Sequence, residues 1–435
     1  MCAGARSPSS TLIPSLIMDF SECTDYLERL GNEVLTMKFG LDTIRTLLRA
    51  MGNPEANYPV VLVAGTNGKG SVARFVRSVC SASGMRSGLF TSPHLVSIRE
   101  RVSVDGIFIS EEQFAEHLSN VVRTIDDLAL EAHPTFFETV TAAAFDYFAK
   151  QEVEIAVVEV GLGGRLDSTN AAEPVLSLLT HVSYDHQQYL GNTLGEIARE
   201  KAGILRPSRP ALSVPQCQEV RQVLRAAVDE TGARLETIDL SQAQKKGHEG
   251  GRYHFVFHGQ NYRLGTCGEH QIMNAALAIR AAEKLQEQGF SIDTKNIRQG
   301  IEDTRVPGVL ERVGREPEIF LDGGHNPEAV ASLVSFLEEH TEEPRKLVFG
   351  IMEDKMTDRV LSILAKPFKQ VYVTQIPSPR AASIEDLMKI HPQAVPVANP
   401  EEAFRQALSG AATTVVAGSF HLVGEISKVL SEDLR

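Results

Sequence analysis

The sequence predicts an α/β protein with a large parallel-sheet N-terminal domain and a smaller Rossmann-like α/β C-terminal domain. Two observations support this prediction. Short apolar runs alternate with amphipathic helical stretches along most of the chain, and a second series of such alternations begins after residue 315. Strands that alternate with helices favour a parallel sheet whose two faces are covered by the helices.

The composition restricts the class of protein. The chain has 435 residues, with 43 Lys and Arg against 56 Asp and Glu, which gives a formal charge of −13. This balance argues against general polyanion binding, so we expect no nucleic-acid partner. Five single cysteines without a CxxC pair are typical of a reducing compartment. The longest apolar runs are far shorter than the roughly 18 residues of a membrane span. We therefore expect a cytoplasmic protein without a membrane partner. A monomer is expected as well.

Four segments are predicted along the chain. Residues 1–17 are rich in Ser, Pro and small residues and are expected to be a disordered tail. Residues 18–304 form the larger domain, residues 305–314 form a linker that contains Pro307 and Gly308, and residues 315–435 form the smaller domain.

The hydrophobic pattern indicates the individual elements. Apolar residues at 41, 44, 47 and 48 follow the helical period, and the run 60–64 reads as a buried strand. The next helix has apolar residues at 72, 75, 76, 79 and 80 and ends near Gly84. The larger domain continues with a helix over 138–150, strands over 155–160 and 175–180, a loop over 183–192, a helix to residue 202, an antiparallel hairpin over 250–263 and a helix over 271–286. The smaller domain has strand candidates at 319–321, 346–350, 370–374 and 413–417.

A glycine-rich loop, Gly65-Thr66-Asn67-Gly68-Lys69-Gly70-Ser71, joins the strand over 60–64 to its helix. Such a turn directs backbone N–H groups and the helix dipole at one point, which suits a triphosphate. Lys69 adds a positive charge and Ser71 offers a hydroxyl for Mg²⁺. The loop departs from the pattern G-x-x-x-x-G-K-[ST], because Val63 holds the first glycine position and Gly70 separates Lys69 from Ser71. A tight turn without a ligand is the weaker alternative. The larger domain is thus predicted to be a P-loop domain that binds a triphosphate.

Two further strand ends carry polar side chains. Glu159 ends the strand over 155–160, and Asp185-His186 follow the next strand. Ligands of open α/β sheets lie at the carboxyl ends of the strands, so these side chains can reach the crevice of the glycine-rich loop and serve Mg²⁺. Taken singly, Glu159 could be paired with Arg165 and His186 could be solvated. Three strand ends in one crevice favour the metal site.

Three other patterns carry less weight. The stretch after Glu159 fails as a dinucleotide fingerprint because Leu166 stands where the last glycine belongs. The spacing of His254, His258, Cys267 and His270 is similar to that of a zinc site. The first two residues, however, fall on the polar face of a predicted strand, and the cysteine has no cysteine partner nearby. The Asn-Lys-x-Asp motif that a P-loop GTPase would need is absent.

Several motifs occur in order along the chain. They are Gly65 to Ser71, Thr91-Ser92-Pro93-His94-Leu95, Phe136-Phe137-Glu138, EVGLGGRLD at 159–167, Glu200-Lys201-Ala202-Gly203-Ile204, His270-Gln271 with Asn274, and DGGHNP at 322–327. Together they closely resemble the dihydrofolate synthase/folylpolyglutamate synthase family of the Mur ligase superfamily. The likeness runs from about residue 26 to the C-terminus.

The resemblance implies an ADP-forming amide ligase. ATP would phosphorylate a carboxylate of a pterin substrate, and the amine of L-glutamate would attack the acyl phosphate. The acceptor would be a folate, dihydropteroate or both, and the metal cofactor would be Mg²⁺, with K⁺ as an additional candidate. Such a reaction depends mainly on positioning and charge neutralisation.

The resemblance also assigns roles by motif position. The catalytic residues would be Lys69, Lys201, His186 and Glu159. ATP would be bound by Asn67, Gly68, Lys69, Gly70, Ser71, Asn274, Asp322 and His325, and the metal by Ser92, Glu159 and His186. The pterin pocket would be formed by Thr135, Phe136, Phe137, Glu138, Leu166 and Asp167. Lys201 matches a lysine that is carbamylated in the family, so we expect a carbamate there that serves the metal site.

Two positions depart from the family pattern. Val309 follows the Pro-Gly of the linker where the family often has arginine, so a phosphate contact is missing unless Arg305 or Arg312 replaces it. Gly324 stands where alanine is usual. Another Mur-type ligase, acting on a cell-wall nucleotide precursor, is the alternative enzyme. A non-catalytic folate-binding module is the alternative outside enzymes.

Overall fold

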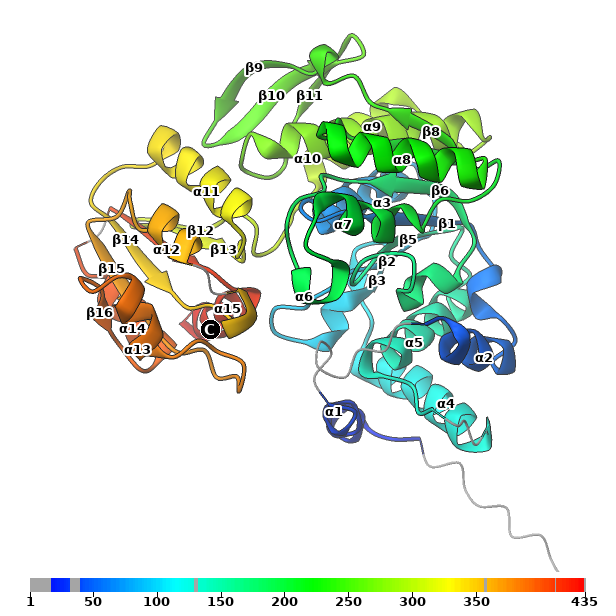
Figure 1. Ribbon diagram of the computed structural model, residues 1–435, viewed down its shortest axis with the longest axis horizontal. Coiled ribbons are helices and arrows are strands. Elements are labelled where there is room, and N and C mark those ends of the chain that lie inside the picture. Colours follow the sequence, from blue (N-terminus) through cyan, green and yellow to red (C-terminus); the bar gives the residue numbers. More distant parts are fainter. Residues whose placement is uncertain (1–16, 32–39, 129–131, 356–357, 411, 434–435) are drawn as a thin grey trace, which may run out of the picture.

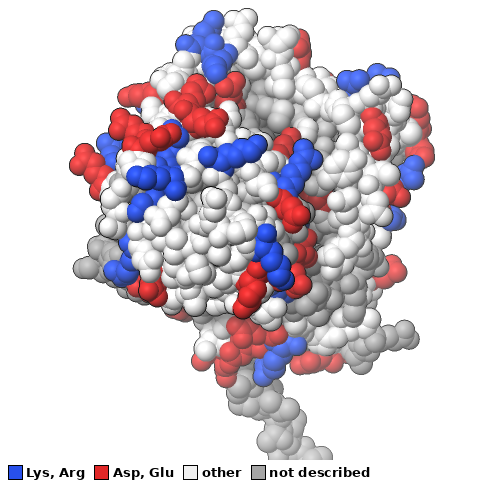
Figure 2. Space-filling model, turned by 60° about the vertical axis from the view of Figure 1, so that its left-hand side comes forward, with Lys and Arg blue, Asp and Glu red and all other residues white. Residues whose placement is uncertain are grey.

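The computed structural model describes residues 17–31, 40–128, 132–355, 358–410 and 412–433. Figure 1 shows two lobes that face each other, with residues from about 310 onward, coloured yellow to red, forming the second lobe. The tail predicted for residues 1–17 lies, except for Ile17, outside the described residues. No helix within these described ranges is long and apolar enough to cross a membrane. Figure 2 shows acidic and basic side chains intermixed over one face.

The first lobe contains an eight-stranded sheet with the strand order β4-β3-β2-β5-β1-β6-β7-β8. The strands are β1 (Val60–Ala64), β2 (Ser87–Phe90), β3 (Val102–Val104), β4 (Ile107–Phe108), β5 (Ile155–Glu159), β6 (Pro174–Leu179), β7 (Pro210–Ser213) and β8 (Arg234–Thr237). β1 pairs in parallel with β5 and β6, whereas β3 and β4 form an antiparallel edge. The predicted parallel sheet is therefore confirmed, with two antiparallel strands added at one edge.

The side chains of β1 alternate between two hydrophobic cores, as expected for a strand that is covered on both faces. Val60, Leu62 and Ala64 enter one core, and Val61 and Val63 enter the other. The first core is covered by α1 (Phe20–Arg29), α2 (Asp42–Ala50), α4 (Glu111–Leu128), α5 (Phe136–Lys150), α6 (Gln187–Leu190), α7 (Leu194–Ala202) and α8 (Gln218–Thr231). The second core is covered by α3 (Lys69–Ala82), α9 (His270–Glu287) and α10 (Thr294–Asp303).

A small antiparallel sheet extends the first lobe toward the second (Figure 1). It contains β9 (Gln244–Glu249), β10 (Arg252–Phe257) and β11 (Gln260–Arg263), so the predicted hairpin is part of a three-stranded sheet. Tyr253, Phe255 and Phe257 point into the second core, because alternate residues of a strand share one face. His258 lies in the turn after β10 with φ 47°, and not on the face of the strand as predicted.

The second lobe has a six-stranded sheet with the order β12-β13-β17-β14-β15-β16. Its elements are β12 (Glu311–Arg315), β13 (Glu318–Asp322), α11 (Pro327–His340), β14 (Arg345–Phe349), α12 (Asp358–Leu364), β15 (Gln370–Val373), α13 (Ile384–Ile390), β16 (Val395–Pro396), α14 (Pro400–Leu408), β17 (Thr413–Ala417) and α15 (Phe420–Asp433). Strands β13 to β17 pair in parallel, and β12 is antiparallel to β13. The stretch predicted as a linker thus contains most of strand β12.

The burial of β1 leads to a stability prediction. Leu62 is 0% exposed, so Leu62→Ala should lower the free energy of unfolding by about 3 kcal/mol through lost burial and a residual cavity. Ile107, which is 75% exposed on edge strand β4, provides the control, and Ile107→Ala should change stability by less than about 0.5 kcal/mol. The midpoints of urea unfolding, followed by circular dichroism, test both values. Equal midpoints would contradict the assignment of β1 as the centre of the core.

Candidate active site

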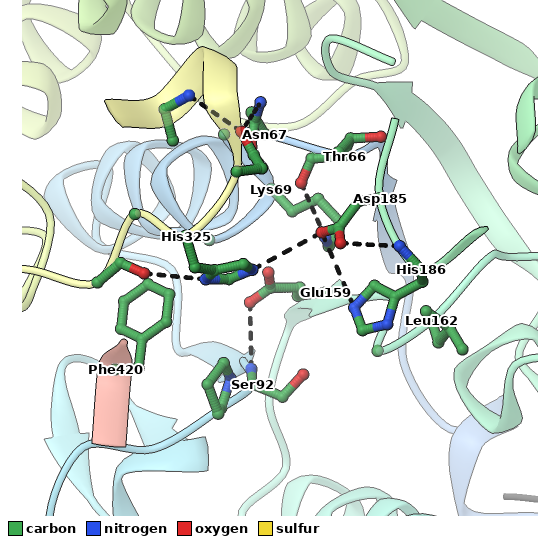
Figure 3. Close-up of a pocket in the computed structure, with 18 of the residues that line it drawn as sticks. Thr66, Asn67, Lys69, Ser92, Glu159, Leu162, Asp185, His186, His325 and Phe420 are labelled. Atoms are coloured by element: carbon green, nitrogen blue, oxygen red, sulfur yellow. Dashed lines mark hydrogen bonds and ion pairs between the residues drawn. The ribbon is translucent and has the colours of Figure 1, made fainter. Parts of the chain in front are cut away.

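A cavity of about 480 Å³ lies between the lobes at the carboxyl ends of β1, β5 and β6. Figure 3 shows that its side chains come from several separate segments of the chain. Most residues predicted from the sequence line this cavity. The exceptions are Phe136 and Lys201.

The glycine-rich loop leads directly into α3, whose N-cap is Gly68 with φ +89°. No side chain caps this helix end, so its N–H groups face the cavity as an anion site requires. A Cβ atom at residue 68 would lie 2.4 Å from Oδ1 of Asn274, which explains why only glycine fits there. Lys69 Nζ donates to the carbonyl oxygen of Thr66 at 3.2 Å and stays beside the loop.

Helix α9 closes the loop from the second core. Asn274 Nδ2 donates to Gln271 Oε1 at 2.9 Å, and Gln271 Nε2 donates to the Ser71 hydroxyl at 3.2 Å. This chain of hydrogen bonds fixes the Ser71 hydroxyl at the start of α3. The predicted nucleotide residues Asn274 and Ser71 are therefore connected through Gln271.

Glu159 ends β5 within reach of the loop. Its Oε2 atom accepts a hydrogen bond from the Ser92 backbone N–H at 3.1 Å. Gly70 lies close to the same oxygen, since a Cβ atom added to this glycine would be 3.3 Å from it. Burial raises the pKa of the Glu159 carboxyl, and the nearby Lys69 ammonium offsets part of this shift. Glu159, Ser92 and the phosphate loop thus meet at one point (Figure 3).

Asp185 is the centre of a cluster of charges that joins the lobes. Lys355 Nζ forms an ion pair with Asp185 Oδ1, and His325 Nε2 lies 3.7 Å from Oδ2. Burial opposes ionisation of Asp185. The hydrogen bond from His325 and the charges of the residues around Asp185 outweigh this effect and hold the pKa of the Asp185 carboxyl well below its usual range. This carboxylate therefore attracts two residues of the second lobe.

His186 is held beside Asp185 in an unusual backbone conformation. Its φ is +49°, and its backbone N–H donates to Asp185 Oδ1 at 2.8 Å. Burial lowers the pKa of the imidazole to about 3, so the ring is neutral at physiological pH. Its Nδ1 atom is buried and makes no hydrogen bond within the described part of the chain. A neutral, unpartnered ring nitrogen can bind a metal ion.

The N-terminal end of α11 contacts the phosphate loop across the gap between the lobes. Asn326 Nδ2 donates to Asn67 Oδ1 at 2.8 Å, and Asn67 Nδ2 donates to Glu328 Oε2 at 2.9 Å. The other Glu328 oxygen lies 3.0 Å from His181 Nδ1. These contacts place the predicted ATP residue Asn67 against the second lobe.

Asp322 is used by the backbone of its own lobe. Its two carboxylate oxygens accept hydrogen bonds from the N–H groups of Leu310 and Gly324, each at 2.8 Å. Burial raises the pKa of this carboxyl to about 6. Asp322 therefore orders the turn that carries His325, whose Nδ1 lies 2.9 Å from the Gly323 carbonyl oxygen.

The predicted pterin residues form one wall of the cavity. The Phe137 ring approaches Gly161 so closely that a Cβ there would lie 2.5 Å from the ring. Thr135 and Glu138 cap α5 reciprocally, at 3.2 and 2.8 Å. Asp167 Oδ2 accepts from the Leu162 N–H at 2.8 Å. Phe136 instead faces the guanidinium of Arg101, 5.3 Å from its ring centre.

Lys201 lies below the phosphate loop, outside the cavity lining. The side chain is buried on α7, and Nζ donates to the Gly65 carbonyl oxygen at 2.7 Å. Burial, with a further contribution from Lys69, lowers the pKa of the amine to about 7. Lys201 is therefore a buried, hydrogen-bonded amine and not a solvated lysine on the surface of its helix.

The structure adds several residues that sequence reasoning missed. Arg74, Glu328, Lys355 and Arg380 also line the cavity. Lys355 lies in the turn Glu353–Lys355, which follows β14. Its place after a predicted parallel strand is the sequence signal that could have identified it as a cavity residue.

Arg305 and Arg312 do not line the cavity. Arg305 donates to backbone carbonyl groups of Glu302 and Thr304, and Arg312 pairs with Glu318 at 3.2 Å.

Comparisons with known proteins agree with this geometry. Residues 63–282 match the Mur ligase middle domain, and residues 310–420 match the Mur ligase glutamate ligase domain. The dihydrofolate synthase/folylpolyglutamate synthase of Bacillus subtilis (strain 168) is 34% identical over 362 residues, which cover 81% of this chain and 84% of that protein. The chain belongs to the dihydrofolate synthase/folylpolyglutamate synthase family. The predicted family resemblance is confirmed, and members of this family are ATP-dependent carbon–nitrogen ligases.

Solved structures of the family extend the likeness over nearly the whole chain. E. coli FolC, in complex with DHPP and ADP, has a TM-score of 0.86 and 28% identity, covering 96% of this chain and 99% of that chain. The Yersinia pestis bifunctional enzyme, complexed with AMPPNP and Mn, has a TM-score of 0.83 and 28% identity, covering 98% of this chain and 100% of that chain. The predicted fold class and the expected use of ATP with a divalent metal are thereby confirmed.

The residues present fit a divalent cation. The buried Nδ1 atom of His186 has no hydrogen-bond partner in the described part of the chain, and Gly70 leaves room beside the Glu159 carboxylate. Carboxylate and hydroxyl oxygens with one imidazole are a suitable ligand set for such an ion next to bound phosphates.

The close approach of Gly68 and Asn274 leads to a second prediction. Gly68→Ala should weaken ATP binding at least about tenfold, because the new Cβ would displace the loop or Asn274. Gly52 provides a matched control: its φ is +86°, and a Cβ there would meet nothing within 4 Å. Gly52→Ala should carry the same backbone strain of about 1 kcal/mol with unchanged ATP affinity. Calorimetric titration with ATP measures both variants, and equal affinities would contradict the proposed role of the loop.

Proposed function

We propose that the protein joins L-glutamate to a folate, to dihydropteroate or to both, while ATP is converted to ADP and phosphate. The observation that carries this proposal is the convergence of the phosphate loop, Glu159, His186 and the charged turn of the second lobe on a single cavity with an apolar wall. Such a cavity can hold a triphosphate, a metal ion and a flat aromatic substrate together.

The nucleotide would lie between the lobes. The N–H groups at the start of α3 and the Lys69 ammonium would bind its phosphates, and Asn67 and Ser71 would flank them. Asn274, Asp322 and His325 would surround the nucleotide from the two sides of the cavity. Asp322 would act by holding the turn of His325, since both of its oxygens accept backbone hydrogen bonds.

Ser92, Glu159 and His186 would hold the divalent cation. The cation would neutralise charge on the transferred phosphoryl group when it is bound. Glu159 remains close to Lys69 and Ser92, and His186 presents a neutral ring nitrogen. These residues therefore position the phosphates against the acceptor carboxylate, which is the main requirement of phosphoryl transfer.

Lys355 and Arg380 would supply positive charge from the second lobe, in place of the linker arginine that is missing at Val309. Lys355 pairs with Asp185, and Arg380 Nη2 pairs with Asp354 Oδ1 at 2.6 Å. Their position across from Lys69 suits the phosphate charge and the carboxylates of glutamate. Arg305 and Arg312 are turned to other partners.

The apolar wall would hold the pterin. Phe137 and Leu166 offer apolar surface, whereas Thr135, Glu138 and Asp167 hold the neighbouring backbone through hydrogen bonds. Phe136 would support the wall from behind through its contact with Arg101. An aromatic side chain beside a flat heteroaromatic ring provides favourable stacking.

The Lys201 amine would be converted to a carbamate by CO₂. The neutral amine attacks CO₂, a proton is released, and the product keeps one N–H that can still donate to the Gly65 carbonyl oxygen. The new carboxylate would extend toward the metal site beneath the phosphate loop. Its negative charge would be favoured there by Lys69 and by the cation.

An acceptor panel tests the function. Purified protein should release ADP in the presence of L-glutamate with tetrahydrofolate, dihydropteroate or both, and Lys69→Ala should reduce this rate more than about 100-fold. Omission of glutamate is the control for ATP hydrolysis without ligation. Ligation only to a cell-wall nucleotide precursor would favour the alternative Mur-type ligase. No ADP release with any acceptor would favour a binding module and overturn the proposal.

Carbamylation of Lys201 is tested by ¹³C NMR after equilibration with ¹³CO₂. The wild-type protein should give a carbamate resonance that Lys201→Ala lacks, and turnover of this variant should fall more than about 100-fold. A short carboxylic acid added to Lys201→Ala should restore part of the turnover. The resonance should weaken below pH 7, because the amine, with a pKa of about 7, becomes protonated and cannot attack CO₂.

Lys346, which also donates to a backbone carbonyl group but is half-buried in the second lobe, provides the matched control. Lys346→Ala should retain the resonance and the activity. Near-normal turnover of Lys201→Ala would contradict the carbamate role.

A further inference from the structure

A second group of metal-binding side chains lies outside the cavity, where the small antiparallel sheet meets the end of α11. His248 comes from β9, and Glu339 and His340 are the last two residues of α11. One ligand atom from each of the three residues lies within 4.8 Å of the others, and His340 Nε2 is 3.6 Å from Glu339 Oε2. The rings of His248 and His340 are 4.3 Å apart at their centres.

We propose that His248, Glu339 and His340 form a binding site for a divalent transition metal, of which Zn²⁺ is the best fit, that joins β9 to α11. Two imidazoles and one carboxylate are a frequent zinc ligand set, with water in the fourth position. Bonds of about 2.0–2.2 Å to the metal require the ligand atoms to approach by roughly 1 Å. His248 and Glu339 are exposed, so both side chains can make this movement from the solvent side.

His340 is the anchored member of the group. Its side chain is 3% exposed, and the Phe336 ring packs against it with centres 4.8 Å apart. The Tyr253 hydroxyl lies 2.7 Å from His340 Nε2 and 3.5 Å from Glu339 Oε2. When the metal takes the ring nitrogen, the Tyr253 hydroxyl can donate to Glu339 instead. An imidazole held in this way loses little side-chain freedom on binding a metal.

The charges around the group also suit a cation. Burial lowers the pKa of the His340 imidazole, with His248 and Lys245 adding to this effect and Glu339 and Glu269 opposing it. The Lys245 ammonium lies 5.2 Å from the centre of the neighbouring Tyr253 ring, and it is paired with Glu269 at 2.6 Å. The C-terminal end of α11 carries the negative end of its helix dipole, which favours a bound cation.

Metal binding here would connect the two lobes. β9 belongs to the sheet that extends the first lobe, whereas α11 covers the second lobe. The opposite end of α11 carries Asn326 and Glu328, which contact the phosphate loop through Asn67. A metal at one end of this helix would therefore hold the lobes in the arrangement in which its other end meets the active site.

The test is calorimetric titration of the chelator-treated full-length protein with ZnCl₂, with Mg²⁺ and ADP present to occupy the cavity. The wild-type protein should bind one more Zn²⁺ per chain than His248→Ala. Glu339→Gln should weaken this binding at least about tenfold. His254 on β10 lies in the same small sheet and outside the group, so His254→Ala is the matched control and should bind as the wild type does.

A second readout does not depend on activity. Zn²⁺ should raise the melting temperature of the wild-type protein and of His254→Ala by roughly 2–4 °C, and of His248→Ala by much less. Because His248 and Glu339 lie on different lobes, loss of zinc binding in both His248→Ala and Glu339→Gln would support a site that bridges the lobes. Identical zinc stoichiometry and affinity in the wild type and His248→Ala would overturn the proposal. Loss of zinc binding in only one of the variants His248→Ala and Glu339→Gln would show that the metal does not bridge the lobes.

Discussion

Parallel strands bring their carboxyl ends to one edge of a sheet, and the active-site cavity depends on this constraint. β1, β5 and β6 are neighbours in the sheet, so the loops that follow them open into one crevice. Each loop brings a different group: the Lys69 ammonium with helix N–H groups, the Glu159 carboxylate and the His186 imidazole. Ligation driven by ATP needs this combination, because charge must be neutralised while two substrates are aligned.

The second lobe completes the cavity through charge. A carboxylate as buried as Asp185, which is 15% exposed, is costly unless it is paired, and its partners Lys355 and His325 both come from the second lobe. Asn326 and Glu328 add contacts to the phosphate loop. The same residues that surround the substrates thus also hold the lobes together, so substrate binding and the relative position of the lobes are physically coupled.

The main elements of the fold could be predicted from the sequence because their apolar patterns are local. β1 and the helix after it have clear periods, and the glycine-rich loop between them carries its own signature. β9, with the sequence Gln-Lys-Lys-Gly-His-Glu, has no apolar alternation, and pairing with β10 makes it a strand. Most of β12 was predicted as linker because Pro307 and Gly308 precede it, and its mostly polar residues become a strand by pairing with β13.

The sequence by itself determined the alternating architecture, the phosphate loop, the strand-end groups Glu159 and His186, and the likeness to a ligase family. Only the tertiary structure decided that Lys355, not Arg305 or Arg312, reaches the cavity, and that Lys201 is buried beneath the phosphate loop. The physical reason is distance along the chain. Gly65 and Lys201 are separated by 136 residues, and the burial and charges that set the pKa of an amine come from neighbours in space, which no local pattern contains.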